Sequence, residues 1–139
     1  MKKGVIYLLL LTMFFSCDSP IIEKIEDKYP NKEPKLVSYY KSEDGKEIKV
    51  EEQHFHENGQ LKMSGKFLNG KRDGEWNAYF ADGKIQSQGA FKEGKRNGLA
   101  KVYFPNGQLR YEGQYENNKE IGHWKFYNEE GKLIDEKDF

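Results

Sequence analysis

Cysteine, proline and charge of one sign are scarce in this chain of 139 residues. Cys17 is the only cysteine, so no disulfide can form within the chain. Lysine plus arginine and aspartate plus glutamate each number 23, which leaves no basic excess of the kind that binds nucleic acid. The apolar stretch from Val5 to Phe15, interrupted only by Thr12, is too short to span a bilayer. These absences argue against a disulfide scaffold, a nucleic-acid-binding protein and a helical membrane-spanning protein.

Motifs for catalysis and for metal binding are also missing. His54 and His56 lie two apart and could supply two metal ligands, but no third ligand accompanies them. Gly94-Lys95 lacks the strand-to-helix context that a phosphate-binding loop needs. Because none of the roles of an active site can be filled, we expect a protein without enzyme activity, metal or cofactor.

The dominant feature that is present is a repeat of 24 residues. Glycines, aliphatic residues and aromatic residues each recur at this interval from Phe55 to the C-terminus. The columns are Gly59, Gly83, Gly107 and Gly131; Leu61, Ile85, Leu109 and Leu133; Phe55, Tyr79, Tyr103 and Tyr127; and Phe67, Phe91, Tyr115 and Phe139. A fixed period indicates one supersecondary unit stacked on copies of itself.

Each repeat is predicted to form a β-hairpin. Two stretches rich in β-favouring residues flank Asn58-Gly59, Asp82-Gly83 or Asn106-Gly107, pairs that favour a two-residue type I′ turn. Such a turn pairs Phe80 with Ile85, Ala78 with Ser87 and Trp76 with Gly89, and it pairs Phe104 with Leu109 one repeat later. The apolar residues of both strands then share one face, which favours strands over helices.

Glycine inside these strands predicts a close contact. Trp76 opposite Gly89 suggests that the indole lies over bare backbone, because a strand glycine is costly unless a neighbour needs the space. Gly113 occupies the same position one repeat later. Trp124 faces Lys137 in this register, so the arrangement is expected to be lost near the C-terminus.

These patterns together predict an all-β fold, an antiparallel β-meander of repeated 24-residue hairpins in an open or curled single sheet. The repeat domain is expected over residues 36–139, with about eight to ten strands. Residues 36–50 form a degenerate first hairpin that caps the stack. Asn118 replaces a loop glycine, and asparagine tolerates the left-handed conformation.

Two segments carry a family resemblance. Residues 76–98 read Trp-x-x-Tyr-Phe-x-Asp-Gly-Lys-Ile-x-x-x-Gly-x-Phe-x-x-Gly-Lys-x-x-Gly. They and the stretch from Tyr103 to Tyr115 resemble the MORN-repeat variant of bacterial proteins. The resemblance covers roughly residues 55–139. Many such proteins are described as YwqK-family antitoxins of toxin–antitoxin systems. The resemblance implies an antiparallel β-sheet with a binding or scaffolding role, and it supplies no catalytic residues.

The N-terminus resembles a bacterial lipoprotein signal. A basic start (Lys2, Lys3), an apolar stretch and Ser16 precede Cys17, which predicts a signal peptide over residues 1–16 and lipidation of Cys17. The charged, proline-containing residues 17–35 are interpreted as a flexible tether, or as a short helix that packs on the sheet through its isoleucines. The expected location is the bacterial cell envelope, with a lipid anchor in a membrane leaflet that the sequence leaves open.

A candidate binding surface is the column Phe55, Tyr79, Tyr103 and Tyr127, predicted on the face opposite Trp76. Aromatic rings spaced along a sheet can stack on sugars or cover apolar side chains of a partner, and they can equally be packing residues. The leading hypothesis is therefore an envelope lipoprotein that binds a protein or an envelope glycan. The alternatives are an antitoxin or immunity-type protein that binds a toxin, and a structural spacer without a partner.

Overall fold

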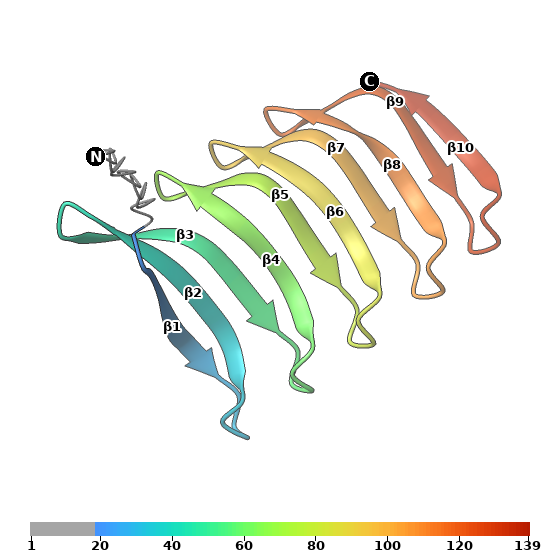
Figure 1. Ribbon diagram of the computed structural model, residues 1–139. Coiled ribbons are helices and arrows are strands. Elements are labelled where there is room, and N and C mark those ends of the chain that lie inside the picture. The colour runs from blue at the N-terminus through green and yellow to red at the C-terminus, as the bar shows by residue number, and fades with distance from the viewer. Residues whose placement is uncertain (1–18) are drawn as a thin grey trace, which may run out of the picture.

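The computed structural model describes residues 19–139, which form a single open sheet of ten antiparallel strands in sequence order (Figure 1). Each strand therefore pairs only with the strands before and after it in the chain. The strands are β1 (Ile21–Lys28), β2 (Pro34–Glu43), β3 (Lys46–Phe55), β4 (Leu61–Leu68), β5 (Lys71–Tyr79), β6 (Ile85–Lys92), β7 (Lys95–Tyr103), β8 (Leu109–Glu116), β9 (Lys119–Tyr127) and β10 (Leu133–Asp138). This architecture confirms the predicted meander of repeated hairpins.

The turns predicted as type I′ have a different geometry. At the β5–β6 turn, the Gly83 amide donates to the Phe80 carbonyl at 2.9 Å and the Phe80 amide donates to the Lys84 carbonyl at 2.8 Å. Gly83 has a φ of 83°, whereas Asp82 is not among the residues of positive φ. The arrangement is that of a turn followed by a glycine bulge, and the Asp82 carboxylate accepts the Lys84 amide at 3.0 Å.

The glycine bulge changes the pairing next to the turn. Trp76 pairs with Gly89 and Ala78 pairs with Ser87 as predicted, but Ile85 pairs with Tyr79. The predicted partner of Ile85, Phe80, belongs to the turn. The pairing of Phe104 with Leu109 is wrong for the same reason, since Leu109 pairs with Tyr103.

The tight turns with two positive φ angles lie at the opposite end of the sheet. Asn69-Gly70 joins β4 to β5 with φ of 50° and 74°, and Asn117-Asn118 joins β8 to β9 with φ of 50° and 71°. Positive φ at both central residues is the requirement of a type I′ turn. The left-handed conformation predicted for Asn118 is confirmed.

The N-terminal part of the sheet corrects the predicted tether. Ile21 pairs with Lys41 and Ile25 pairs with Val37, so residues 21–28 form the edge strand β1. The repeated β-branched isoleucines favour a strand, and the charged residues between them suit an exposed sheet edge. The repeat sheet thus begins before residue 36. The predicted signal peptide and Cys17 lie outside the described residues.

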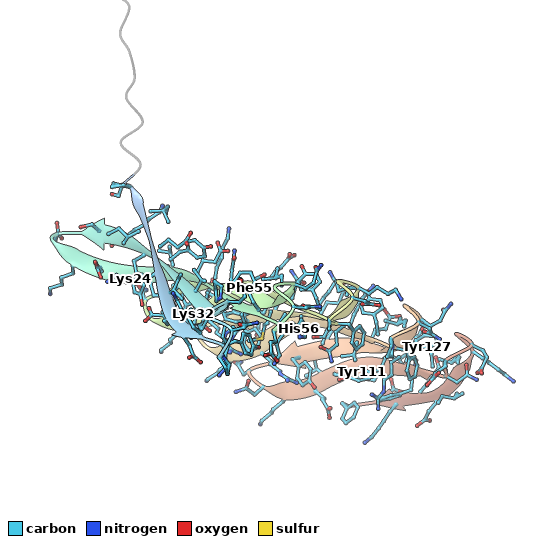
Figure 2. All side chains as sticks on the ribbon, turned by 90° about the horizontal axis from the view of Figure 1, so that it is seen from below. Lys24, Lys32, Phe55, His56, Tyr111 and Tyr127 are labelled. Carbon is cyan, nitrogen blue, oxygen red and sulfur yellow. The ribbon has the colours of Figure 1, made fainter. Side chains whose placement is uncertain are left out.

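The buried hydrophobic residues of the sheet are few and are dominated by two tryptophans. Val37, Trp76 and Trp124 are the buried hydrophobic residues within 19–139. We call the sheet side that carries both indoles the tryptophan face, and the other side the tyrosine face. Figure 2 views the sheet from below with side chains on both sides of it. Across residues 19–139 no helix has the length and apolarity to cross a membrane.

Each indole lies over a glycine of the preceding strand. A Cβ atom added at Gly65 would overlap the Trp76 ring, and one added at Gly113 would overlap the Trp124 ring. The predicted contact of Trp76 with Gly89 is wrong, because nothing lies within 4 Å of a Cβ at Gly89. The expected loss of the arrangement at Trp124 is also wrong. Both errors have one cause: the indole leans toward the earlier of its two neighbouring strands.

Rings of the column Phe67, Phe91, Tyr115 and Phe139 separate and support the indoles. The centroids of Phe67 and Phe91 lie 5.5 and 6.1 Å from Trp76, both edge-on. Tyr115 and Phe139 flank Trp124 in the same way, at 5.1 and 5.9 Å. Edge-to-face contacts of this kind stabilise aromatic clusters beyond their area burial. The tryptophan face is thus covered by its own rings.

Candidate functional site

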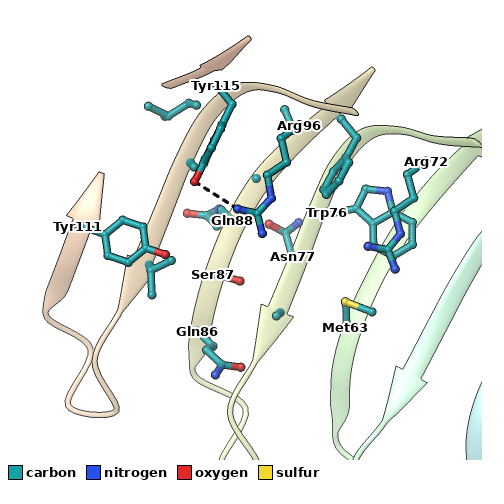
Figure 3. Close-up of a pocket in the computed structure, with 17 residues that line it drawn as sticks. Met63, Arg72, Trp76, Asn77, Gln86, Ser87, Gln88, Arg96, Tyr111 and Tyr115 are labelled. Atoms are coloured by element: carbon teal, nitrogen blue, oxygen red, sulfur yellow. Dashed lines mark hydrogen bonds between the residues drawn. The ribbon is translucent and has the colours of Figure 1, made fainter. Parts of the chain in front are cut away.

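The tryptophan face has a gap at Ala100. This residue occupies the repeat position of Trp76 and Trp124, and it pairs with Gly89 on the neighbouring strand. With no indole over Gly89, a pocket of about 370 Å³ opens at this place (Figure 3). We call it the Gly89 pocket, defined by Gly89, Phe91, Ala100 and Tyr115. Its volume lies at the lower end of the range typical of ligand sites.

Four aromatic rings line the pocket: Trp76, Phe91, Tyr111 and Tyr115. Phe91 and Tyr115 belong to the column whose members flank each tryptophan, and both line the pocket. Phe91 already contacts Trp76 on one side, and Tyr115 already contacts Trp124 on the other. The pocket therefore has the surroundings of an indole without the indole.

Two arginines make the pocket positively charged. The Arg72 guanidinium lies 4.0 Å from the Trp76 ring centroid and 5.6 Å from that of Phe91. Arg96 lies 5.1 Å from the Tyr115 centroid and donates a hydrogen bond to the Tyr115 hydroxyl at 3.2 Å. Figure 3 shows Arg96 between Tyr115 and Trp76. No carboxylate lines the pocket, and within residues 19–139 neither arginine forms an ion pair.

The predicted aromatic column lies elsewhere. Its four members are each the last residue of a strand: Phe55 of β3, Tyr79 of β5, Tyr103 of β7 and Tyr127 of β9. The Tyr103 hydroxyl donates to Gln88 at 3.0 Å and the Tyr127 hydroxyl donates to Glu112 at 3.3 Å, which places both on the tyrosine face. Every member is half-buried. The structure brings the column together along one end of the sheet, and its binding role stays a prediction.

The histidines considered as metal ligands have separate partners. His54 Nε2 lies 2.6 Å from Glu52 Oε1, whereas His56 Nε2 lies 2.9 Å from the Tyr79 carbonyl oxygen in the next repeat. Burial raises the pKa of Glu52, but hydrogen bonds from Lys49 and His54 outweigh it and leave the pKa below its ordinary value. Among residues 19–139 no three histidine, cysteine or acidic side chains form a metal-binding group.

Sequence reasoning missed the Gly89 pocket. The signal for it is Ala100. Tryptophan stands one period of 24 residues before it, at Trp76, and one period after it, at Trp124. It was overlooked because Trp76 was assigned to cover Gly89. Arg72 and Arg96, one period apart, stack on the rings of this face.

The family comparison agrees with this geometry. The MORN repeat variant matches the chain four times, at residues 50–69, 72–93, 96–117 and 120–139. The chain belongs to the MORN repeat variant family. MORN repeats are generally involved in binding. The resemblance of the repeats to this family is thereby confirmed.

Comparisons beyond the family add little. No curated protein matches the chain. Among solved structures, one entitled "Crystal Structure of TarM" is similar at 18% sequence identity and a TM-score of 0.37. The similar region covers 73% of this MORN repeat chain and 20% of that one, so the chain spans about a fifth of its length. A likeness this weak carries no argument about function.

Proposed function

We propose that this MORN repeat protein is a non-enzymatic lipoprotein of the bacterial cell envelope whose sheet binds another macromolecule. One observation carries the proposal: a sheet that is open on both sides presents an unfilled pocket framed by aromatic rings and arginines. Exposed aromatic and arginine side chains are the residue types enriched at protein interfaces. The binding role typical of MORN repeats supports the same conclusion.

The proposed anchor is Cys17, at the end of the apolar N-terminal stretch. Strand β1 begins at Ile21, only four residues later. A fully extended chain advances at most about 3.6 Å per residue, so the sheet would begin within about 15 Å of the lipidated cysteine. The N-terminal edge of the sheet would then lie close to the membrane, with the Gly89 pocket on β6 and β7 farther along the sheet.

A toxin is the alternative partner. The resemblance to YwqK-family antitoxins favours this candidate, and an anchored protein could intercept a toxin at the envelope. The two versions share the chemistry of the sheet and differ in the identity of what binds to it.

The deciding experiment is a crosslinking pull-down from native membranes with the tagged full-length protein, with mass spectrometry of the captured partner and of the bait N-terminus. The proposal predicts a lipid mass on Cys17 and one dominant partner, whose identity separates an envelope component from a toxin. Cys17→Ala should release the bait from the membrane fraction. A Cys17→Ala bait that stays in the membrane would contradict the anchor, and a bait without any partner would favour a structural spacer.

The two faces can be separated by mutation. If the tyrosine face binds, Tyr79→Ala combined with Tyr103→Ala will abolish partner capture while the β-sheet circular dichroism persists. If the tryptophan face binds, the same double variant will capture the partner normally. Loss of the circular dichroism would instead show that the tyrosines are packing residues.

A further inference from the structure

We infer that the Gly89 pocket receives an aromatic side chain, tryptophan above all, from a partner polypeptide that carries a carboxylate beside that ring. The inference rests on the proposed binding function and names the chemistry that one face would recognise.

The chain itself shows what fits over such a glycine. In two of three equivalent places an indole lies on bare backbone, Trp76 over Gly65 and Trp124 over Gly113. The third place, over Gly89, has the same glycine and the same pair of flanking rings but no indole. An indole from outside the chain would find the edge-on ring contacts that each internal tryptophan makes.

The two indoles use different hydrogen-bond acceptors, since Trp124 Nε1 donates to the Ile121 carbonyl of its own strand at 3.2 Å. Trp76 Nε1 donates to the Lys66 carbonyl at 3.2 Å. The residue one period after Lys66 is Ala90, which lines the pocket. A tryptophan that follows the geometry of Trp76 could donate to the Ala90 carbonyl, which phenylalanine could not do. This difference favours tryptophan as the occupant.

The charge of the pocket indicates which group of the partner should lie beside the aromatic ring. Arg72 and Arg96 line a pocket that contains no acidic side chain. Arg96 already stacks against Tyr115, so its guanidinium is held at the pocket, where it can stack on an incoming ring or bind a carboxylate. Since neither arginine is ion-paired within residues 19–139, an acidic group of the partner would meet two uncompensated positive charges.

The test is an NMR titration of the ¹⁵N-labelled full-length chain with N-acetyl-tryptophan, which combines an indole with a carboxylate. We expect saturable shifts of the Gly89, Arg96 and Ala100 amides, with a dissociation constant of about 0.1–1 mM, as the efficiency of small ligands implies. N-acetyl-tryptophanamide, which lacks the carboxylate, should bind several-fold more weakly. N-acetyl-leucine should leave these amides unshifted.

Variants locate the binding. Ala100→Trp restores the repeat, so we expect at least tenfold weaker probe binding at an unchanged or higher unfolding temperature. Gly89→Val fills the pocket from below and should also block the probe, which keeps the test valid if Ala100→Trp fails to fold. Gln114→Trp adds the same ring at an exposed site on the tyrosine face and should bind the probe normally. Arg96→Gln should reduce the preference for the carboxylate probe over the amide.

Three results would overturn the inference. One is probe-induced shifts confined to the column of Tyr79 and Tyr103. Another is equal binding of both tryptophan probes. The third is a chemical shift of the Gly89 amide that changes with protein concentration and does not change when the probe is added. This result would assign the pocket to a second copy of the chain.

The pull-down separates failure of this inference from failure of the proposed function. A partner captured equally by wild type and Ala100→Trp would leave the binding function intact and overturn the assignment of the pocket. Probe binding without any captured macromolecule would overturn the proposed function and leave the pocket in place.

Discussion

At the residue scale, the fold depends on glycine and tryptophan that meet across neighbouring strands. Trp76 and Trp124 are buried although the sheet has only one layer, because each lies flat on a strand that has no side chain at the point of contact. The glycine costs conformational entropy, and the buried indole area offsets that cost. Arg72 then covers the outer side of the Trp76 ring with its guanidinium.

The three strand glycines should therefore respond differently to alanine. Gly65→Ala and Gly113→Ala force the indole off the sheet, so each should lower the free energy of unfolding by about 3 kcal/mol or more. Gly89→Ala meets no atom and requires no positive φ, so it should be neutral or stabilise by about 0.5 kcal/mol. Urea denaturation followed by tryptophan fluorescence measures all three. Equal destabilisation by all three variants would contradict the assigned packing.

Individual residues also show where sequence reasoning stops. The pairing of Trp76 with Gly89 was predictable from the turn position and the alternation of apolar residues. The direction in which the indole leans was not, because Trp76 has glycine on both neighbouring strands and the pattern does not distinguish them. The Gly89 pocket follows from that direction, so the candidate site was hidden although the register around it was correct.

At the element scale, the last hairpin is held by an ionisable cluster. His123 of β9 lies 3.0 Å from Glu136 and 2.7 Å from Asp138 of β10. The hydrogen bonds to Glu136 and then to Asp138 raise the pKa of His123 above its ordinary value. The strand β9 runs through both Gly122 and His123, and His123 pairs with Asp138 of β10.

The sign of this pKa shift gives a pH dependence. A raised folded-state pKa means that the histidine stabilises the fold fully below pH 6.5 and loses this contribution as pH rises through the folded value. We expect His123→Gln to lower the unfolding temperature at pH 5.5 and to have a smaller effect at pH 8.5. Thermal melts of wild type and His123→Gln across this pH range test the prediction. The difference between their unfolding temperatures removes the contribution of titrating groups that the two proteins share. A difference that grows with pH would contradict the cluster.

Elements were predictable to the extent that their signals are local. The hairpins followed from period-two alternation and from glycine at fixed positions. The sequence did not predict that the type I′ turns lie at only one end of the sheet, at pairs such as Asn69-Gly70. Asp82-Gly83, at the other end, is an equally good sequence for a type I′ turn but forms a turn with a glycine bulge. Strand β1 was misread as a tether because its composition is that of an exposed, charged edge, where isoleucines such as Ile21 and Ile25 remain about half exposed.

At the scale of the whole molecule, the sheet is a one-dimensional array. Every strand contacts its sequence neighbours, so stability is approximately the sum of terms from each repeat and from each interface between repeats. No layer packs across either face within residues 19–139. A ligand bound to one repeat therefore stabilises that repeat and its neighbours, and the rest of the sheet is little affected.

This organisation predicts that one whole repeat can be removed. Deletion of residues 77–100 takes out one period of 24 residues and joins Trp76 to Lys101 with the alternation preserved. The shortened chain should keep its β-sheet circular dichroism and unfold cooperatively, because Trp76 still follows Gly65 and the later hairpins are unchanged. It should also lose the binding of N-acetyl-tryptophan, since Gly89 and Ala100 are gone.

The matched control deletes residues 77–99, one residue fewer. The alternation then slips by one, so every later side chain up to the next turn would point to the opposite face of the sheet. Val102 would leave the tryptophan face and could no longer pair with Tyr111, whose ring centroid lies 6.0 Å from that of Trp124. Circular dichroism and urea denaturation then compare the 77–100 deletion, which keeps the 24-residue period, with the 77–99 deletion, which shifts it by one residue. A folded control would show that the 24-residue register does not determine the sheet.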